Sequence, residues 1–314
     1  MPRWQGSPFP GLRAFTTADA PIFFGRERET DELIRKVEQH RVCFIMGASG
    51  SGKSSIVGAG LLPRLRAGAV PGSADWLIPE YDKVAQRWHG VRFSPAERGG
   101  DVFLALAAQL APLLGLQPGT LADRLRSEPW SLEGVAGPVL MPGRTVLIFV
   151  DQFEELFTSV APCDRIAFVK LLCQPTPAVR WVLTVRSDFY HRCVDIPELS
   201  RLMVVGQFPL SVPADTLLDM ITKPAERALL EFDEGLTWRI LDETGQEPGS
   251  LALILDSSVS HSARRPVPAW NWAARPVFGQ RYSAPWQPIF RISPTAAPWL
   301  INTECLCGHW QQAA

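Results

Sequence analysis

The chain has 314 residues, of which 46% are hydrophobic and 20% charged, and its formal net charge is −1. This balance is typical of a globular protein with one large or two ordinary domains, and it lacks the overall basic charge that predicts binding to nucleic acid or an anionic membrane. The six cysteines show no spacing typical of a metal site, so we expect reduced thiols in a cytoplasmic protein without a membrane segment.

The first part of the chain predicts a helix and a strand that lead into a glycine-rich turn. Residues 1–25 are rich in proline and phenylalanine, and we expect an extended segment there. A helix is predicted from Arg26, because the apolar residues that follow fall on one helical stripe among charged ones. A short apolar strand, residues 42–46, precedes the turn, and a second helix follows it. Residues 69–100 mix turn signals with short strand-like pieces and give no clear assignment.

The turn itself, residues 47–54, reads Gly-Ala-Ser-Gly-Ser-Gly-Lys-Ser and fits the pattern G-x-x-x-x-G-K-[ST]. Glycines let backbone N–H groups wrap a phosphate, and the helix that opens there favours anions. Lys53 supplies a point charge for the β- and γ-phosphates, and the Ser54 hydroxyl is a hard ligand for Mg²⁺. A flexible Gly/Ser turn is the alternative, but the flanking strand and helix favour phosphate binding. The expected nucleotide-binding residues are Gly47, Ala48, Ser49, Gly50, Ser51, Gly52, Lys53, Ser54 and Ser55.

Two further strands end in charged residues. The almost wholly apolar run 145–150 stops at Asp151, and the run 181–185 stops at Arg186. Such runs are typical of central parallel strands that are buried on both faces, and strands alternating with helices predict an open α/β sheet. The helices expected around these strands are residues 101–116, with Asp101 as N-cap, and residues 163–173.

Asp151 is the expected acidic partner of Ser54 in holding Mg²⁺. Glu154 and Glu155 follow within one turn, and either could polarise an attacking water as general base. The alternative for both is the acidic first turn of a helix, which the helix dipole favours. Gln152 occupies the position at which many ATPases carry the base, which moves that role to one of the two glutamates. The sequence leaves open which of them it is.

Arg186 is a candidate to contact the γ-phosphate and so to report its presence. The alternative is a surface arginine paired with Asp188. In open parallel sheets, ligands bind beyond the carboxyl ends of the strands. Because Gly47, Asp151 and Arg186 each follow such an end, we expect them to converge on one site.

Five segments in this order resemble the novel STAND NTPase domain: "PFPGLRAF", "FFGRERE", "GASGSGKSSIVGAGLLPRL", "VDQFEELF" and "VLTVRSDFYHRC". This domain is a bacterial branch of the signal-transduction ATPases related to NACHT and NB-ARC. The resemblance covers residues 8–255. It implies a P-loop NTPase fold with three αβα layers and a mostly parallel sheet, followed by a small helical subdomain.

The resemblance also implies roles for particular residues. It places the motif at 24–27 beside the adenine and ribose, through Gly25, Arg26 and Glu27. It makes residues 151–155 a Walker B arrangement, with Asp151, Glu154 and Glu155, and it makes Arg186 the sensor arginine. Ala252 stands where the family has a proline, which puts the nucleotide-dependent coupling through that loop in doubt. The implied cofactors are ATP or ADP with Mg²⁺, and the implied partners are proteins or further copies of the chain.

We expect four parts: an N-terminal segment (1–25), the P-loop NTPase core (26–208), part of a helical subdomain (209–255) and an irregular tail (256–314). The tail is rich in tryptophan, proline and arginine and has no lasting period. We interpret it as out-of-frame translation after about residue 255, which would truncate the family's pattern. A tail that binds a partner by stacking is the alternative.

The leading functional hypothesis is an ATP-binding regulatory NTPase, an intracellular switch with slow Mg²⁺-dependent hydrolysis. One alternative is a truncated remnant that signals nothing. A second is a DNA-associated ATPase of the AAA type, which the near-neutral charge disfavours. A third is a small-molecule kinase, for which the sequence shows neither an arginine-rich lid nor an acceptor pocket.

Overall fold

The structure is a computed structural model that describes residues 4–128, 130, 132–136, 145–212, 215–232, 235–244 and 290–292. Its centre is a five-stranded sheet with the order β4-β5-β6-β1-β7, in which every pairing is parallel. This confirms the expected α/β class. In sheet order the strands are β4 (Arg92–Phe93), β5 (Val146–Val150), β6 (Val179–Arg186), β1 (Val42–Gly47) and β7 (Gln207–Pro209).

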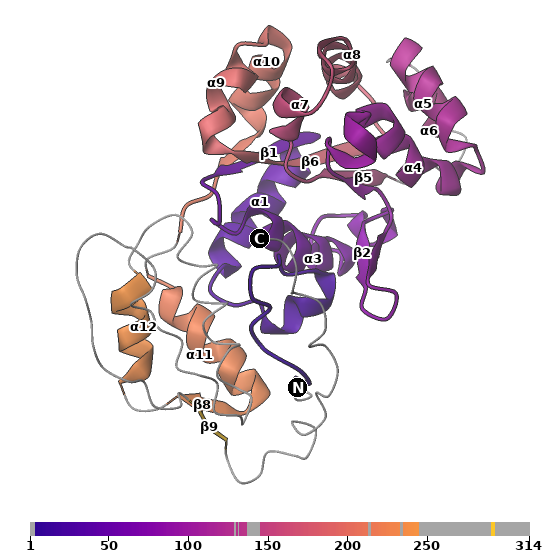
Figure 1. The fold of residues 1–314 in the computed structure, drawn as a ribbon. Coiled ribbons are helices and arrows are strands. Elements are labelled where there is room, and N and C mark those ends of the chain that lie inside the picture. Colours follow the sequence, from indigo (N-terminus) through magenta and orange to yellow (C-terminus); the bar gives the residue numbers. More distant parts are fainter. Residues whose placement is uncertain are drawn as a thin grey trace, which may run out of the picture.

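Helices cover both faces of this sheet and give the expected three αβα layers (Figure 1). Along the strands, Phe44 and Leu183 point into one buried layer, and their neighbours Ile45 and Val182 point into the other. The first layer contains α4 (Val102–Leu114), α5 (Pro118–Ser127), α6 (Leu132–Ala136), α7 (Glu155–Thr158), α8 (Pro162–Cys173), α9 (Tyr190–Val194) and α10 (Pro197–Gly206). The second contains α1 (Glu27–Gln39) and α3 (Leu62–Arg66).

The expected N-cap at Asp101, at the start of α4, is confirmed. The carboxylate of Asp101 accepts a hydrogen bond from Leu104 N at 2.9 Å, which satisfies one of the free N–H groups at the start of α4. Helix α4 ends at Gly115, whose φ of 64° permits the left-handed turn. Among the described residues no single helix is long and apolar enough to cross a membrane, and the pair α4 and α5 reaches that length only with a bend of 119°.

The N-terminal segment packs onto the core more closely than an extended segment would. It contains a short 3₁₀ helix, η1 (Thr17–Ile22), and buries Phe9 and Phe15. The fully buried Asp19 accepts hydrogen bonds from Thr16 N and from Arg13. Burial alone would raise the pKa of Asp19, but these bonds outweigh it and hold the pKa below its ordinary value. Residues 4–25 are therefore an anchored part of the folded unit.

The helix that follows the glycine-rich turn contains a π-helical stretch. It runs through α2 (Lys53–Ser55), η2 (Ile56–Leu61) and α3. A Cβ atom at Gly58 would lie 2.4 Å from the carbonyl oxygen of Phe15, and one at Gly60 would lie 2.8 Å from Thr30 Oγ1. The two glycines thus let the N-terminal segment and α1 approach this helix closely.

The stretch 69–100, which the sequence left unassigned, has mostly short elements. These are η3 (Ser73–Asp75), the antiparallel hairpin of β2 (Glu80–Asp82) and β3 (Arg87–His89), the edge strand β4, and η4 (Glu97–Gly100). The hairpin is tied to the N-terminal segment by a hydrogen bond from Tyr81 N to Thr17 Oγ1 at 2.8 Å. Such short pieces carry too few residues for a recognisable period.

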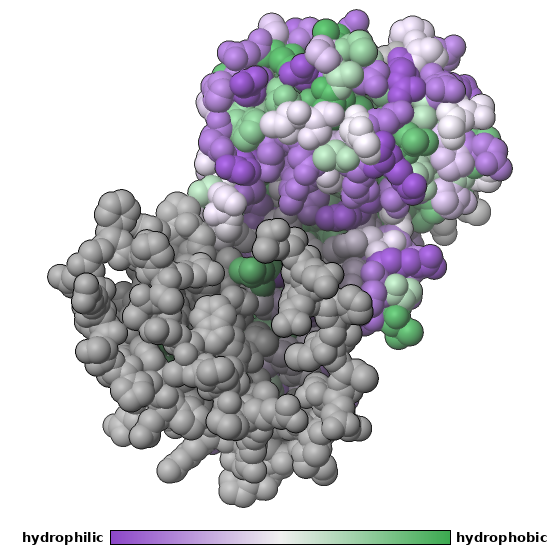
Figure 2. Space-filling view, in the orientation of Figure 1, coloured by the Kyte–Doolittle hydropathy of each residue, from purple (hydrophilic) through white to green (hydrophobic). Residues whose placement is uncertain are grey.

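Beyond the sheet, α11 (Leu217–Ala228) packs on α12 (Leu236–Thr244), and β8 (Leu230–Phe232) pairs with β9 (Phe290–Ile292). Helix α11 also contacts the N-terminal segment, because Trp4 N donates to Arg227 O at 3.0 Å. Apart from β9, our expectations for Ala252 and for the tail 256–314 lie outside the described residues. The visible surface over the α4–α10 layer is mostly hydrophilic, with small separate apolar areas (Figure 2).

Candidate nucleotide site

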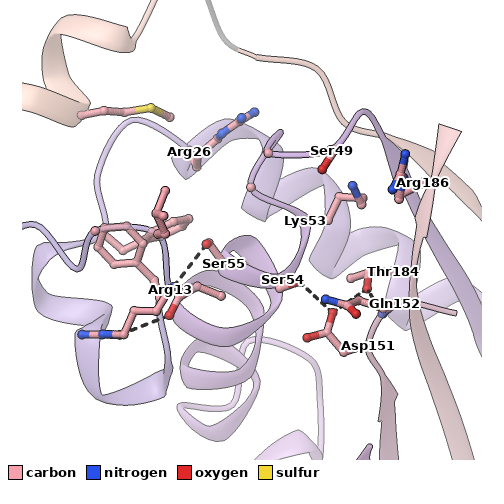
Figure 3. Close-up of a pocket in the computed structure, with 18 of the residues that line it drawn as sticks. Arg13, Arg26, Ser49, Lys53, Ser54, Ser55, Asp151, Gln152, Thr184 and Arg186 are labelled. Atoms are coloured by element: carbon pink, nitrogen blue, oxygen red, sulfur yellow. Dashed lines mark hydrogen bonds between the residues drawn. The ribbon is translucent and has the colours of Figure 1, made fainter. Parts of the chain in front are cut away.

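A cavity of about 560 Å³ lies at the carboxyl ends of neighbouring strands of the sheet (Figure 3). Strand β1 ends at Gly47, whose partner in the sheet is Arg186 at the end of β6. Strand β5, next to β6, is followed directly by Asp151. The sheet thus brings together the three strand ends at which the sequence placed candidate residues. A cavity of this size is large enough for a nucleotide-sized ligand.

The glycine-rich turn holds its lysine folded back on the loop. Gly50 and Gly52 have φ values of 76° and 87°, in the left-handed region that favours glycine. Lys53 Nζ donates to the carbonyl oxygens of Gly47 at 2.9 Å and Ala48 at 2.8 Å. Burial lowers the pKa of Lys53 from its ordinary value. The ammonium group therefore lies inside the loop, where it has exchangeable carbonyl partners.

Asp151 is hydrogen-bonded to the turn although the two are far apart in sequence. Its Oδ1 accepts from Ser54 Oγ and from Thr184 Oγ1, each at 2.7 Å. Thr184 Oγ1 accepts in turn from the backbone N–H of Gln152 at 2.9 Å, and Gln152 has a φ of 55° (Figure 3). Thr184 was not among the residues expected from the sequence, although it is the only polar residue between Trp181 and Val185.

The structure separates the two glutamates that the sequence could not distinguish. Glu154 is buried and lines the cavity, and its Oε2 accepts from Arg186 N at 3.2 Å. Burial raises the pKa of Glu154 above its ordinary value. The carboxylate of Glu155 lies outside the cavity lining and accepts hydrogen bonds from Ser94 Oγ and Ala96 N. Glu154 is thus placed to act on a ligand, whereas Glu155 fastens the segment after β4.

The position of Arg186 is compatible with both alternatives that the sequence left open. It lines the cavity, and its guanidinium also pairs with Asp188, with Nη2 2.7 Å from Oδ2. The Arg186 side chain is 43% exposed, so this ion pair contributes little stability and is readily exchanged for another anion. The arrangement leaves Arg186 able to turn towards a phosphate.

Arg26 connects the turn to the chain that leads into the helical subdomain. Its side chain is only 3% exposed, and burial lowers its pKa. One nitrogen, Nη2, donates to Ser51 O at 2.9 Å; the other, Nη1, donates to Ser211 O at 2.6 Å and pairs with Glu29 at 2.8 Å. A buried guanidinium with this many partners fixes the position of all three groups.

The other two residues of the same motif differ in their surroundings. Gly25 has a φ of 79°, and a Cβ atom there would lie 2.6 Å from the Met220 side chain on α11. Its carbonyl oxygen accepts a hydrogen bond from Thr216 Oγ1 at 2.6 Å. Glu27, in the first turn of α1, is exposed and lies outside the cavity lining. Neither residue lines the cavity, and Gly25 instead packs against Met220 on α11.

The N-terminal segment forms the opposite wall of the cavity from Asp151 and Arg186 (Figure 3). Leu12, Arg13 and Phe15 line it together with Phe23, and Phe15 N donates to Ser55 Oγ at 3.2 Å. From the sequence, only an extended segment was expected here. Its phenylalanine content was the one indication of packing, since phenylalanine is among the residues most often buried.

Comparisons with known proteins agree with the α/β fold. The chain is similar to the solved structure of the Walker-type ATPase PABY2304 of Pyrococcus abyssi, with a TM-score of 0.50 and 16% identity over 79% of this chain and 71% of that chain. It is similar to the ORC2 protein of Aeropyrum pernix in ADPNP–ADP complexes, with a TM-score of 0.51 and 15% identity over 76% of this chain and 62% of that chain. It is also similar to the ORC1 protein of Aeropyrum pernix in complex with DNA, with a TM-score of 0.52 and 17% identity over 80% of this chain and 63% of that chain. At these identities the likeness shows the fold alone.

This chain spans less than two thirds of the length of either Aeropyrum protein. None of the curated proteins matches the sequence. A family model does match it, over residues 8–259, and its description is Novel STAND NTPase 1. That match includes the glycine-rich turn, the Asp151 segment and Arg186, so the chain belongs to the Novel STAND NTPase 1 family.

Proposed function

We propose that this protein binds ATP and ADP with Mg²⁺ and acts as a cytoplasmic signalling switch that hydrolyses ATP slowly. The observation that carries the proposal is the 2.7 Å hydrogen bond between Ser54 Oγ and Asp151 Oδ1. It joins a phosphate-binding turn to the acidic end of a buried strand, at the mouth of a cavity of nucleotide size. The four described cysteines are free, as a cytoplasmic location favours.

The residues of the site fit a nucleotide and its metal ion. Ser51 Oγ is buried and has no hydrogen-bond partner among the described residues, and a phosphate oxygen in the turn would supply one. Ser54 and Asp151 offer the hard oxygen atoms that Mg²⁺ prefers. Bound Mg²⁺ would neutralise charge on the phosphates. Lys53 Nζ would exchange its two loop carbonyls for phosphate oxygens.

In this proposal Glu154 is the general base and Arg186 the group that contacts the γ-phosphate. The raised pKa of Glu154 brings its carboxylate closer to the basicity that proton abstraction from water needs.

The proposal keeps the expected division of the chain, with residues 26–208 as the NTPase core and 209–255 as the helical subdomain. Arg26 and Gly25 link the two parts, which is what a nucleotide-dependent change in their arrangement would require.

The test is to purify the chain, denature it and identify any released nucleotide, and then to measure ATP and ADP affinity with and without Mg²⁺. Lys53→Ala is expected to lose at least about 100-fold in affinity, because the buried ammonium contact to the phosphates disappears. Lys170→Ala, an exposed lysine on α8, is the matched control and should bind as the wild type does. Unchanged affinity in the Lys53 variant would sink the phosphate-binding assignment.

A second candidate is a DNA-associated ATPase, which the likeness to the DNA-bound ORC1 protein favours. Under this alternative, DNA should stimulate turnover, and the stimulation should fall steeply with salt. A truncated remnant would instead retain little nucleotide after purification. Stoichiometric ADP without any effect of DNA would support the switch over both alternatives.

A further inference from the structure

Arg92, on the edge strand β4, is fixed next to Asp151 by the hydrogen bonds of the sheet. Phe149 N donates to Val91 O and Asp151 N donates to Phe93 O, each at 2.9 Å, so Arg92 stands between two ladder bonds. A slip of one residue would turn its side chain to the other face of the sheet. The position of Arg92 beside the acidic strand end is therefore built into the register.

The guanidinium of Arg92 holds the one carboxylate oxygen of Asp151 that the hydroxyl groups leave free. Ser54 and Thr184 both donate to Oδ1, whereas Arg92 Nη2 lies 2.9 Å from Oδ2. The Asp151 side chain is 7% exposed and that of Arg92 is 26% exposed, so water screens this pair only partly. Arg92 Nε is buried and has no hydrogen-bond partner in the described part of the chain.

The same guanidinium has a second anionic partner nearby. Arg92 Nη1 lies 3.6 Å from Glu97 Oε1, and the guanidinium lies 5.8 Å from the centre of the Trp88 ring. Glu97 comes from η4 and Trp88 from the β2–β3 hairpin. A small rotation of the side chain can thus exchange Asp151 for Glu97 without leaving the charge unpaired.

We propose that Arg92 is a positioning residue that holds Asp151 in the metal-free site and yields it, moving towards Glu97, when Mg²⁺ and nucleotide bind. This inference rests on the proposed function, because it needs Asp151 to serve the metal. Two cations compete for one carboxylate, so the arginine raises the Mg²⁺ concentration that the site requires. When the metal is absent, Arg92 also supplies the buried Asp151 carboxylate with a cationic partner.

The test is the Mg²⁺ concentration that gives half of the full effect on ADP affinity, measured with a fluorescent ADP. Arg92→Gln should lower this concentration by roughly tenfold, because a charge this close changes the affinity of a carboxylate for another cation by at least that factor. Arg92→Lys should restore most of the wild-type value. Affinity for ADP in EDTA should stay within about twofold, since the arginine acts on the metal and not on the phosphates.

Thermal unfolding supplies a readout that does not depend on activity. Arg92→Gln should melt earlier than the wild type in EDTA, where Oδ2 of Asp151 loses its guanidinium partner, and the difference should shrink with Mg²⁺ and ADP. Arg126→Gln is the matched control, because Arg126 also pairs with carboxylates, is 31% exposed and lies outside the cavity lining. Its loss of stability should be the same with and without the metal.

Glu97→Gln removes the second anionic partner of Arg92 and leaves Arg92 itself intact. It therefore tests the proposed movement of Arg92 even if the Arg92 variant does not fold. Without the second anionic partner, Arg92 should stay on Asp151, and the Mg²⁺ requirement should rise several-fold. If the wild type itself shows no Mg²⁺ dependence, the proposed function fails. If the wild type depends on Mg²⁺ and neither variant shifts that dependence, or if Arg92→Gln weakens ADP binding equally in EDTA, the role of Arg92 is overturned.

Discussion

At the scale of single residues, the environment of Glu154 makes a prediction about both activity and stability. Burial raises the pKa of its carboxyl group in the folded protein, so folding favours the protonated form. Stability from this group is fully present below the unfolded-state pKa and is lost as the pH rises through the higher folded-state pKa. Above its folded-state pKa the group is therefore ionised at a cost, while the same ionised form is the one that can act as base.

We expect Glu154→Gln to lower the rate of ATP hydrolysis by at least about 100-fold, and to raise the melting temperature at pH values above the folded-state pKa of Glu154. The amide oxygen can still accept the hydrogen bond from Arg186 N, which keeps the loop in place. Glu155→Gln is the comparison. It should lose stability, since Ser94 and Ala96 donate to its carboxylate, but it should keep measurable turnover. Equal loss of turnover in both variants, with no gain in stability for Glu154→Gln, would contradict the assignment.

The residues that the sequence identified are those whose role depends on a local pattern. Lys53 stands in a motif of fixed spacing, and Asp151 ends an apolar run, so both were visible without the fold. Thr184 and Arg92 act on Asp151 from two other strands, and only the register of the sheet brings them there. No periodicity in a single chain segment carries that information.

At the scale of elements, the close packing of the N-terminal segment on the π-helical stretch depends on Gly58. A Cβ atom at this position would lie 2.4 Å from Phe15 O, a backbone atom that cannot move by a rotamer change. We expect Gly58→Ala to cost about 1–3 kcal/mol, as overpacking usually does. Because it displaces the wall of the cavity that Phe15 forms, it should also weaken nucleotide binding.

Gly119→Ala is the matched control for that substitution. Gly119 lies in α5, and a Cβ atom there would meet nothing within 4 Å. This variant should gain up to about 1 kcal/mol, because alanine is the better helix former. Chemical denaturation of both variants, with nucleotide titrations alongside, checks the pair. A Gly58 variant as stable as the wild type would show that the N-terminal segment does not pack as the structure has it.

Long elements with strong patterns were predictable from sequence, and short ones were not. The buried strands are predicted by apolar runs, helix α1 by one apolar stripe, and helix α4 by its N-cap. Strand β4 has only two residues and takes its place from its pairing with β5. The N-terminal segment is held by tertiary contacts of Phe15 with Ser55 and of Thr17 with Tyr81, which local propensity does not report.

At the scale of the whole molecule, Arg26 is the described side chain that bridges the phosphate-binding turn and the chain leading into α11. Its two terminal nitrogens bind Ser51 O and Ser211 O, which are 160 residues apart in sequence (211 − 51). A phosphate that orders the turn would therefore also order this connection. Two sites are coupled when binding at one changes contacts that the other also uses. Arg26 contacts both the phosphate-binding turn and the chain leading into α11.

We expect nucleotide to slow hydrogen exchange in both the glycine-rich turn and α11 of the wild type. In Arg26→Ala the turn should still gain protection from nucleotide, whereas the gain in α11 should fall several-fold, because the shared guanidinium is gone. Arg28→Ala is the control, since Arg28 lies two residues further on in the first turn of α1, is 85% exposed and pairs only with Glu32 among the described ion pairs. Undiminished protection of α11 in the Arg26 variant would mean that coupling runs through Gly25 and Thr216 instead. Loss of protection in both regions would assign Arg26 to nucleotide binding alone and remove the link on which a switch of this kind depends.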